Sequence, residues 1–222
     1  MPDTALPEGL IAWADRSLQN GEHILATSNQ GTVLRYDRDG HDLVLKTAMG
    51  RGAVLRARRA TLDREYGAYR RLEGVPGVPR CHGMLDGRYL VLQYVRGTPY
   101  REAVIEDRQR WFGLLLETLQ ACHERGVAHG DLKRKSNLLA GDDGRPWIID
   151  FGLTVVRRDG FHPINHRLFA FFRQLDLNAW VKHKYQGRFD EVSEADRRYF
   201  HDTLIERVTR RQRQWRGVQG PR

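Results

Sequence analysis

Short runs rich in apolar and β-branched residues alternate with polar, turn-forming residues in the first part of the chain. Residues 31–36 and 43–46 have this strand pattern, and the Asp39-Gly40 pair between them is typical of a tight turn. Residues 89–95 are mostly apolar, which is the pattern of a buried strand. These segments predict a sheet.

Helical patterns cover most of the remaining chain. Residues 53–72 have a helical composition and are followed by a run of glycine and proline. Apolar side chains recur at helical spacing from about Asp107 to Arg125, and further helices are expected over 165–185 and from about Ser193 into the C-terminal tail. Strands that precede helices indicate two lobes of unlike class, so we predict an α+β fold.

Composition and charge add a constraint on partners. The 222 residues are 40% hydrophobic and 29% charged, with a mean hydropathy of −0.62, as in ordinary soluble domains. No apolar run predicts a membrane span, and residues 1–10 lack a signal-peptide pattern. Cys81 and Cys122 lack metal-type spacing. We therefore expect a cytoplasmic protein with reduced thiols. A net charge of +9 favours an anionic partner, although a basic, unspecialised surface explains it equally well.

Two polar segments carry the residue types with the clearest chemistry. Residues 129–137 have the sequence His-Gly-Asp-Leu-Lys-Arg-Lys-Ser-Asn, and an Asp-Phe-Gly begins at Asp150, after a short apolar strand. Two carboxylates and an amide at one cleft edge form the set that holds Mg²⁺ and orients a hydroxyl group. We expect His129 to pack beneath this loop rather than to carry a proton.

These two segments resemble the catalytic loop and the metal-binding Asp-Phe-Gly of the protein-kinase-like superfamily. The resemblance covers roughly residues 23–185. It implies a two-lobed fold with a small β-rich N-lobe and a reduced helical C-lobe. On this basis residues 1–22 are an N-terminal extension, 23–95 the nucleotide-binding N-lobe, 96–206 the catalytic C-lobe and 207–222 a basic tail.

The resemblance also implies roles for individual residues, with ATP and Mg²⁺ as cofactors. Asp131 is similar to the catalytic aspartate that accepts the proton of the acceptor hydroxyl, and Lys133 to the lysine that steadies the moving phosphoryl group. Lys46 resembles the strand lysine on the α- and β-phosphates, with Glu65 as its ion-pair partner. Asp176 is similar to a buried helix carboxylate that anchors the backbone of the catalytic loop.

A second group of residues would bind the nucleotide and the metal. Asn137 and Asp150 are the implied Mg²⁺ ligands. The remaining implied contacts belong to the loop over the phosphates and to the inter-lobe hinge at adenine, namely Gly31, Val33, Leu92, Gln93 and Val95.

The loop over the phosphates departs from the family pattern. When the sequence is aligned on Val33, Ala26 and Ser28 occupy positions where the family has glycine, and only Gly31 remains. Alanine and serine restrict the loop where glycine lets the backbone approach a phosphate closely.

The catalytic loop is one residue longer than the family pattern. Asn137 lies six residues after Asp131, where the family has five, and Ser136 occupies the usual position. The apolar pair that follows Asn137 matches the pair that follows the family's asparagine. We therefore favour Asn137 as the ligand, with a one-residue bulge, over Ser136.

The residues after Asp-Phe-Gly bear on the acceptor. Only about 70 residues follow it, without an Ala-Pro-Glu motif, which leaves little room for a peptide-docking platform. Compact relatives fit best: the bacterial lipopolysaccharide kinases, the RIO kinases and the kinase of the tRNA threonylcarbamoylation assembly. The His-Gly-Asp-Leu-Lys form favours the first group, so we expect an ATP-dependent kinase that phosphorylates Kdo or heptose of a glycolipid.

Two other functions and one feature of the tail stay open. The chain is alternatively a compact Ser/Thr protein kinase with a protein acceptor, or a non-catalytic nucleotide-binding pseudokinase scaffold. No nucleic acid partner is expected. Residues 207–222 contain six arginines, Trp215 and no acidic residue. They form either a solvated basic terminus or a peripheral contact with the anionic surface of the inner membrane.

Overall fold

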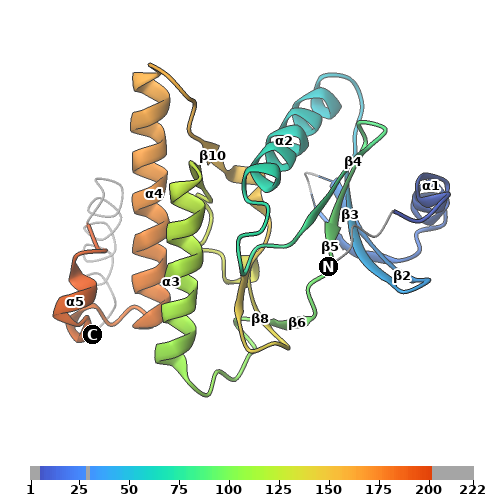
Figure 1. The fold of residues 1–222 in the computed structure, drawn as a ribbon. Helices are drawn as coiled ribbons and strands as arrows, with labels where there is room; N and C mark the ends of the chain where they lie inside the picture. Colours follow the sequence, from blue (N-terminus) through green and yellow to red (C-terminus); the bar gives the residue numbers. More distant parts are fainter. Residues whose placement is uncertain (1–5, 29–30, 202–222) are drawn as a thin grey trace, which may run out of the picture.

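The computed structural model describes residues 6–28 and 31–201. The predicted basic tail, residues 207–222, lies outside these ranges. A β-rich lobe and a helical lobe lie side by side (Figure 1), as predicted. No helix in the described ranges is both long and apolar enough to span a membrane.

An antiparallel sheet of five strands forms the centre of the first lobe, in the order β1-β2-β3-β5-β4. Its strands are β1 (Ile24–Thr27), β2 (Gly31–Arg38), β3 (His41–Ala48), β4 (Cys81–Leu85) and β5 (Tyr89–Gln93). β2 and β3 pair without a shift around the predicted turn, which places Lys46 opposite Val33 on one side and Leu90 on the other.

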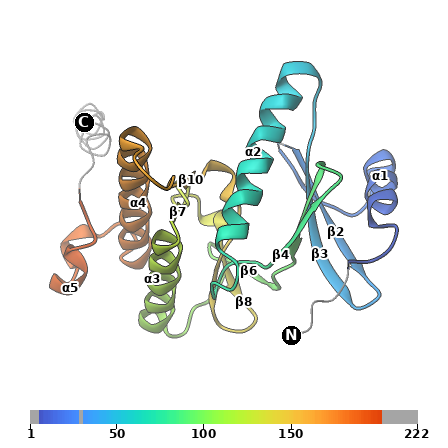
Figure 2. The same ribbon diagram turned by 45° about the horizontal axis from the view of Figure 1, so that its top comes forward.

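Each face of this sheet is covered by one helix. Tyr89 and Val91 of β5 pack with α1 (Leu10–Asn20), whereas Leu90 and Leu92 belong to the cluster that contains α2 (Gly52–Arg71). Figure 2 shows α1 and α2 on either side of the sheet. The N-terminal extension that we predicted is therefore largely a helix that closes the outer face of the sheet.

Polar contacts explain why α1 stays on the sheet. Asp15 accepts hydrogen bonds from Arg88 at 2.6 Å and from the Tyr89 hydroxyl at 2.5 Å. The hydrogen bond from Tyr89, with the charge of Arg88, outweighs burial and lowers the pKa of Asp15. The spacing of α1 gave no such indication, because its partners lie more than seventy positions away in the chain.

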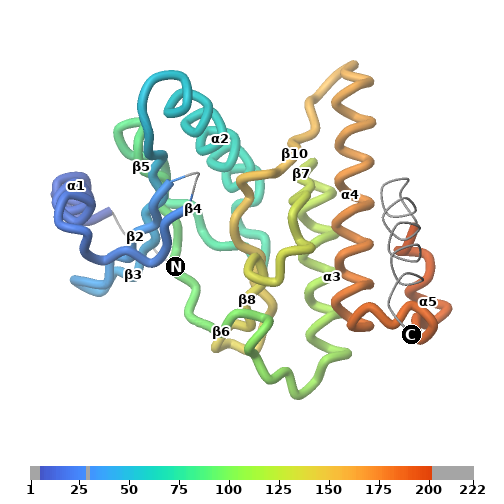
Figure 3. The backbone as a smooth tube through the Cα atoms, turned by 180° about the vertical axis from the view of Figure 1, so that it is seen from behind, coloured from blue at the N-terminus to red at the C-terminus, as the bar shows by residue number. Residues whose placement is uncertain are grey.

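Two long antiparallel helices, α3 (Arg108–Glu124) and α4 (Pro163–Lys184), run beside each other in the second lobe (Figure 3). Its other elements are the sheet β6-β8-β9 (Gly97–Pro99, Leu138–Gly141 and Pro146–Ile148), the pair β7–β10 (Val127–Ala128 and Val155–Val156), the short helix α5 (Glu194–Arg197) and the 3-10 turns Lys135–Asn137, Phe151–Leu153 and Phe189–Glu191. Asp107 caps α3 by accepting a hydrogen bond from the Arg110 amide at 2.9 Å.

One prediction about the last helix is wrong. We expected a helix from about Ser193 into the tail, but α5 ends at Arg197. The chain then turns back onto α4, where the Tyr199 ring packs edge-on against Trp180 at 5.5 Å and the His201 amide donates to Asn178. Packing against α4 stabilises this turn in place of a longer helix.

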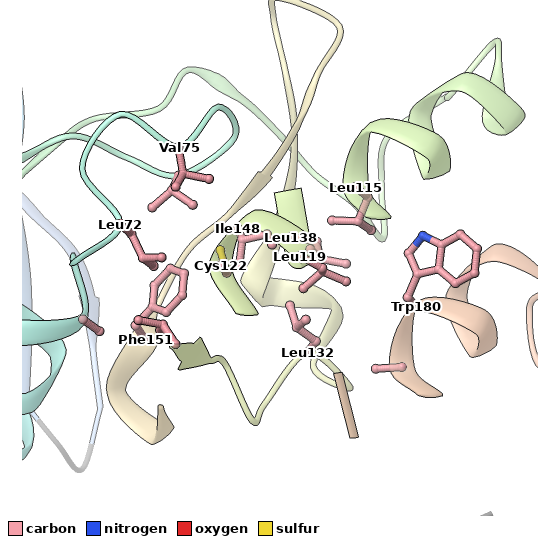
Figure 4. Packing of buried hydrophobic residues seen from close by; sticks show 14 of the residues in the cluster. Leu72, Val75, Leu115, Leu119, Cys122, Leu132, Leu138, Ile148, Phe151 and Trp180 are labelled. Atoms are coloured by element: carbon pink, nitrogen blue, oxygen red, sulfur yellow. The ribbon is translucent and has the colours of Figure 1, made fainter. Parts of the chain in front are cut away.

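One apolar core runs from α2 into the helical lobe. Figure 4 shows Leu72 and Phe151 near the first lobe and Leu115, Leu119 and Trp180 deeper in the second. The chain itself crosses between β5 and β6, and this connection contains Val95, one of the predicted hinge residues. This crossing and the core hold the two lobes against each other, and the candidate site residues lie where the lobes meet.

Candidate active site

Three charged residues predicted from separate parts of the chain meet in the structure. Lys46 of β3 donates to Glu65 of α2 at 2.6 Å and to Asp150 at 3.1 Å. The Glu65 side chain is 5% exposed and that of Asp150 is 45% exposed. The lysine thus links the sheet, the helix and the Asp-Phe-Gly turn, and one of its two carboxylate partners still faces the cleft.

This arrangement keeps Lys46 and Asp150 charged. Burial alone would lower the pKa of Lys46, but the charges of Glu65 and Asp150 outweigh burial and raise it. Burial likewise would raise the pKa of Asp150, and the Lys46 ammonium outweighs it, so this pKa is lowered. A buried charge without its partner is costly, which makes the position of α2 depend on the pair.

The backbone of Asp150 is unusual, and its neighbours keep it so. Asp150 has φ = 67° and ψ = 73°, a left-handed conformation that non-glycine residues rarely adopt. Its amide donates to the Tyr69 hydroxyl at 3.3 Å, and the next residue, Phe151, packs edge-on against the Tyr69 ring. Phe151 is fully buried, so the apolar core anchors the turn that presents the carboxylate.

The backbone of the catalytic loop is anchored from α4. Asp176 accepts hydrogen bonds from the amides of His129 and Gly130, both at 2.8 Å, and lies 3.1 Å from His123 Nε2. Asp176 is 1% exposed. The predicted role of Asp176 as the anchor of this loop is confirmed by these contacts.

His129 lies beneath the loop, as predicted. Its Nε2 donates to the Ile149 carbonyl at 3.0 Å, and its Nδ1 accepts from the Asp131 amide at 3.2 Å. These partners assign the Nε2–H tautomer. The imidazole, which packs edge-on against Phe151, therefore connects the Asp131 backbone to the strand that leads into Asp150.

Gly130 is required by the geometry of this loop. Its φ is +81°, and a Cβ there would lie 2.5 Å from Cδ1 of Phe172 in α4. Both the backbone conformation and the lack of space exclude a larger residue. The close approach of Phe172 fixes the loop from the side of α4.

Asp131 is partly accessible, with 20% of its side chain exposed. Its carboxylate is 3.2 Å from Nε of Arg134, which is itself 70% exposed. Lys133 lies on the same loop and lines a second cavity. The sequence analysis did not single out Arg134 as a partner of Asp131.

Asn137 and Ser136 differ clearly in their surroundings. Asn137 is 4% exposed, and its Nδ2 donates to the Asp131 carbonyl at 3.1 Å. This bond uses the amide nitrogen and leaves Oδ1 with a weak contact at 3.4 Å from the Ser136 hydroxyl. The loop forms a 3-10 turn over Lys135–Asn137. Both the one-residue bulge that we favoured and ligand binding by Asn137 stay predictions.

A mostly apolar cavity of ≈ 330 Å³ lies between the lobes. Its lining includes the predicted hinge residues Leu92, Gln93 and Val95, together with Val33, Lys46, Asn137 and Asp150. An apolar slot with a few charged groups at one end suits a planar base that carries phosphates. The structure thus brings hinge, lysine and candidate metal ligands to one site.

Gly31 lies beside this site but also has a structural reason to be glycine. It lines a smaller cavity with Lys46, Glu65 and Asp150. A Cβ on Gly31 would lie 2.0 Å from the Thr47 carbonyl of the paired strand β3. Strand packing therefore requires glycine at this position, and a contact of Gly31 with phosphate stays a prediction.

Tyr69 is a site residue that sequence reasoning missed. It is 1% exposed and lines the cleft cavity. Burial, reinforced by the nearby charge of Glu65, raises its pKa, so Tyr69 stays a neutral phenol. Tyr69 lies four residues after Glu65 on a predicted helix, so both side chains are on one face of it. This spacing could have identified Tyr69 as a neighbour of Glu65 in the site.

Known proteins resemble parts of this chain. No family model matches it. CBL-interacting protein kinase 9 of Oryza sativa subsp. japonica is 30% identical over 133 residues, or 55% of this chain and 29% of that protein. CBL-interacting serine/threonine-protein kinase 13 of Arabidopsis thaliana is 42% identical over 74 residues (31% and 14%), and CBL-interacting protein kinase 4 of Oryza sativa subsp. japonica is 38% identical over 105 residues (42% and 23%).

These similarities support distant homology to the protein-kinase-like superfamily. The chain spans less than a third of the length of each of these relatives. None of them supports the resemblance to lipopolysaccharide kinases or a sugar acceptor, and the protein-kinase alternative fits them better.

Proposed function

We propose that this protein is an ATP-dependent protein kinase that transfers the γ-phosphate of ATP to a serine or threonine hydroxyl. The observation that carries this proposal is the contact of Lys46 with both Glu65 and Asp150 at the end of the inter-lobe cavity. The loss of two glycines from the loop over the phosphates would, by itself, favour a nucleotide-binding scaffold. The charged groups needed for phosphoryl transfer are nevertheless all present.

The donor atoms fit Mg²⁺. Asp150 supplies a carboxylate that stays ionised, and Asn137 supplies an amide oxygen beside it in the same cavity. Mg²⁺ prefers such oxygen ligands and is commonly held by one or two protein side chains together with phosphates and water. Bound with ATP, the metal ion would neutralise charge on the phosphates.

The residues of the chain have separate tasks in this proposal. Lys46 holds the phosphates against the cleft, and its ion pair with Glu65 fixes the ammonium in place. Asp131 orients the acceptor hydroxyl and accepts its proton, and Lys133 steadies the transferred group. Because phosphoryl transfer depends mainly on positioning and charge neutralisation, the rigid anchoring of the loop contributes directly to rate.

The choice of acceptor rests on the relatives. Those quoted are named as protein kinases, one of them as a serine/threonine kinase, and they share sequence with this chain over segments of 74 to 133 residues. We therefore rank a protein acceptor above Kdo or heptose, the acceptor expected from the short C-terminal part.

The test compares wild type with Asp131→Asn, using labelled ATP, Mg²⁺ and general protein acceptors. The substitution removes the proton acceptor at similar size, so turnover falls on the order of 10²-fold or more, while nucleotide affinity changes little. Asp190→Asn, on an exposed turn, is the matched control. Near wild-type transfer by Asp131→Asn refutes the role of Asp131. Transfer to a lipopolysaccharide core sugar but to no protein refutes the acceptor.

A further inference from the structure

A second cavity, of ≈ 390 Å³, is lined by Lys133 and Lys135 of the catalytic loop. It is formed by the loop, the segment after β6 and the C-terminal end of α4. Five of the side chains that line it are basic and none is acidic; the basic ones are Arg101, Arg108, Lys133, Lys135 and Lys182. It shares no lining residue with the cleft cavity, to which the same loop contributes Ser136 and Asn137.

Much of this positive charge is not neutralised within the protein. Among residues 6–28 and 31–201, Arg101, Lys135 and Lys182 have no carboxylate within ion-pair distance. Arg108 donates to the carbonyls of His183 and Lys184 at the end of α4, at 3.2 and 3.3 Å, and so remains a net cation. The next basic residue on α4, Lys184, points away and pairs with Asp196 at 2.6 Å.

The pKa of a buried histidine in the wall of the cavity is affected by this charge. His183 Nε2 donates to the Leu132 carbonyl of the catalytic loop at 2.7 Å. Burial lowers the pKa of His183, and the charges of Lys135 and Lys182 lower it further. Cations that cluster without counter-charge raise the local potential, which an incoming anion relieves.

The cavity is close to the residue that would orient the acceptor. Lys133 and Lys135 follow Asp131 by two and four residues, so their Cα atoms lie at most about 7 and 14 Å from its Cα. An extended peptide advances about 3.3 Å per residue. A peptide whose hydroxyl meets Asp131 can therefore place side chains two to four positions away in this cavity.

We propose that the basic cavity selects the protein acceptor by binding acidic side chains near the phosphorylated serine or threonine. This inference rests on the proposed protein-kinase function and specifies its substrate class. Carboxylates two to four residues from the acceptor would pair with Lys135, Lys182 and Arg101. A lysine-rich segment would be repelled, which gives the site its specificity.

The experiment uses the full chain and three peptides that differ only around one serine. The flanking positions carry glutamate, glutamine or lysine. We expect kcat/KM for the glutamate peptide to exceed that for the glutamine peptide about tenfold at low salt, since each of several exposed ion pairs contributes roughly a two- to fivefold factor. The preference declines as sodium chloride is added.

Charge reversal separates a binding role from a structural one. The double variant Lys135→Glu/Lys182→Glu should lose the preference for glutamate and turn over the lysine peptide faster than the glutamate peptide. Arg16→Glu, an exposed residue of α1 on the far side of the sheet, is the matched control and should keep the wild-type preference. Fluorescence anisotropy with labelled peptides measures binding independently of turnover.

The outcomes distinguish this inference from the proposed function. Wild-type protein that phosphorylates all three peptides equally overturns the inference and leaves the protein-kinase function standing. Absence of transfer to every peptide and protein overturns the proposed function. Anisotropy then tests the cavity alone: binding of the glutamate peptide that is lost in the double variant supports a site for acidic peptides. Anionic vesicles or RNA that bind through these lysines, without binding of the glutamate peptide, overturn the assignment to a protein acceptor.

Discussion

Asp176 offers the sharpest test of how the catalytic loop is held. Its carboxylate is fully buried in α4 and accepts from the amides of His129 and Gly130, both at 2.8 Å. Asp176→Asn keeps the size and one acceptor oxygen, but the new amide group faces one of the two backbone N–H groups. That N–H loses its partner in a site that water does not reach.

The magnitude follows from these contacts. A hydrogen bond to a charged group contributes roughly 1.5–3 kcal/mol, and a buried donor left without a partner costs roughly 1–3 kcal/mol. Asparagine also removes a buried charge, which offsets part of the loss. We expect the free energy of unfolding to fall by about 3 kcal/mol, a large share of the roughly 5–15 kcal/mol that stabilises a typical domain.

Urea denaturation, followed by tryptophan fluorescence, measures this change. With a slope of about 2–3 kcal/mol per M, the midpoint should fall by about 1 M or slightly more. Hydrogen exchange at His129 and Gly130 should accelerate more than exchange in the sheet of the first lobe. The exposed substitution Asp190→Asn serves as the control, and a midpoint for Asp176→Asn within about 0.3 M of that control would show that the anchor contributes little.

Three further outcomes follow from the site. Asn137→Ala should greatly raise the Mg²⁺ concentration needed for half-maximal turnover, whereas Ser136→Ala should change it little; the opposite ranking in a Mg²⁺ titration would make Ser136 the ligand. Burial and nearby lysines lower the pKa of His183 from 6.5. Its contribution to stability is therefore complete above about pH 6.5 and is lost as the pH falls towards its folded pKa. Denaturation at pH 7 and pH 5 should show that the free energy of unfolding declines at the lower pH, and His183→Gln should reduce this decline. Gly130→Ala should destabilise the fold by roughly 1–3 kcal/mol, because φ is positive and the Phe172 ring blocks a Cβ; a thermal or urea midpoint equal to wild type would mean that the loop relaxes without cost.

Local patterns in the sequence were sufficient to predict β2, β3, β5 and the three longest helices. The strand pairing around Asp39-Gly40, the helix after β3 and the helix capped at Asp107 depend on turn residues and periodicity within short windows, which the sequence displays directly. For Lys46, Asp131 and Asp150 it was the resemblance to the protein-kinase-like superfamily that implied phosphoryl transfer, and their roles stay predictions.

Only the tertiary structure decided how distant segments meet. Asp15 pairs with Arg88 over 73 positions, and Lys46 meets Asp150 over 104. The contact of Asp176 with His129, over 47 positions, was implied by the family resemblance and by no local pattern. The basic cavity joins residues that no short window contains. Such contacts depend on the packing of α1, α2 and α4, which forms only when their apolar faces are buried together, and a local pattern specifies the face but not the partner.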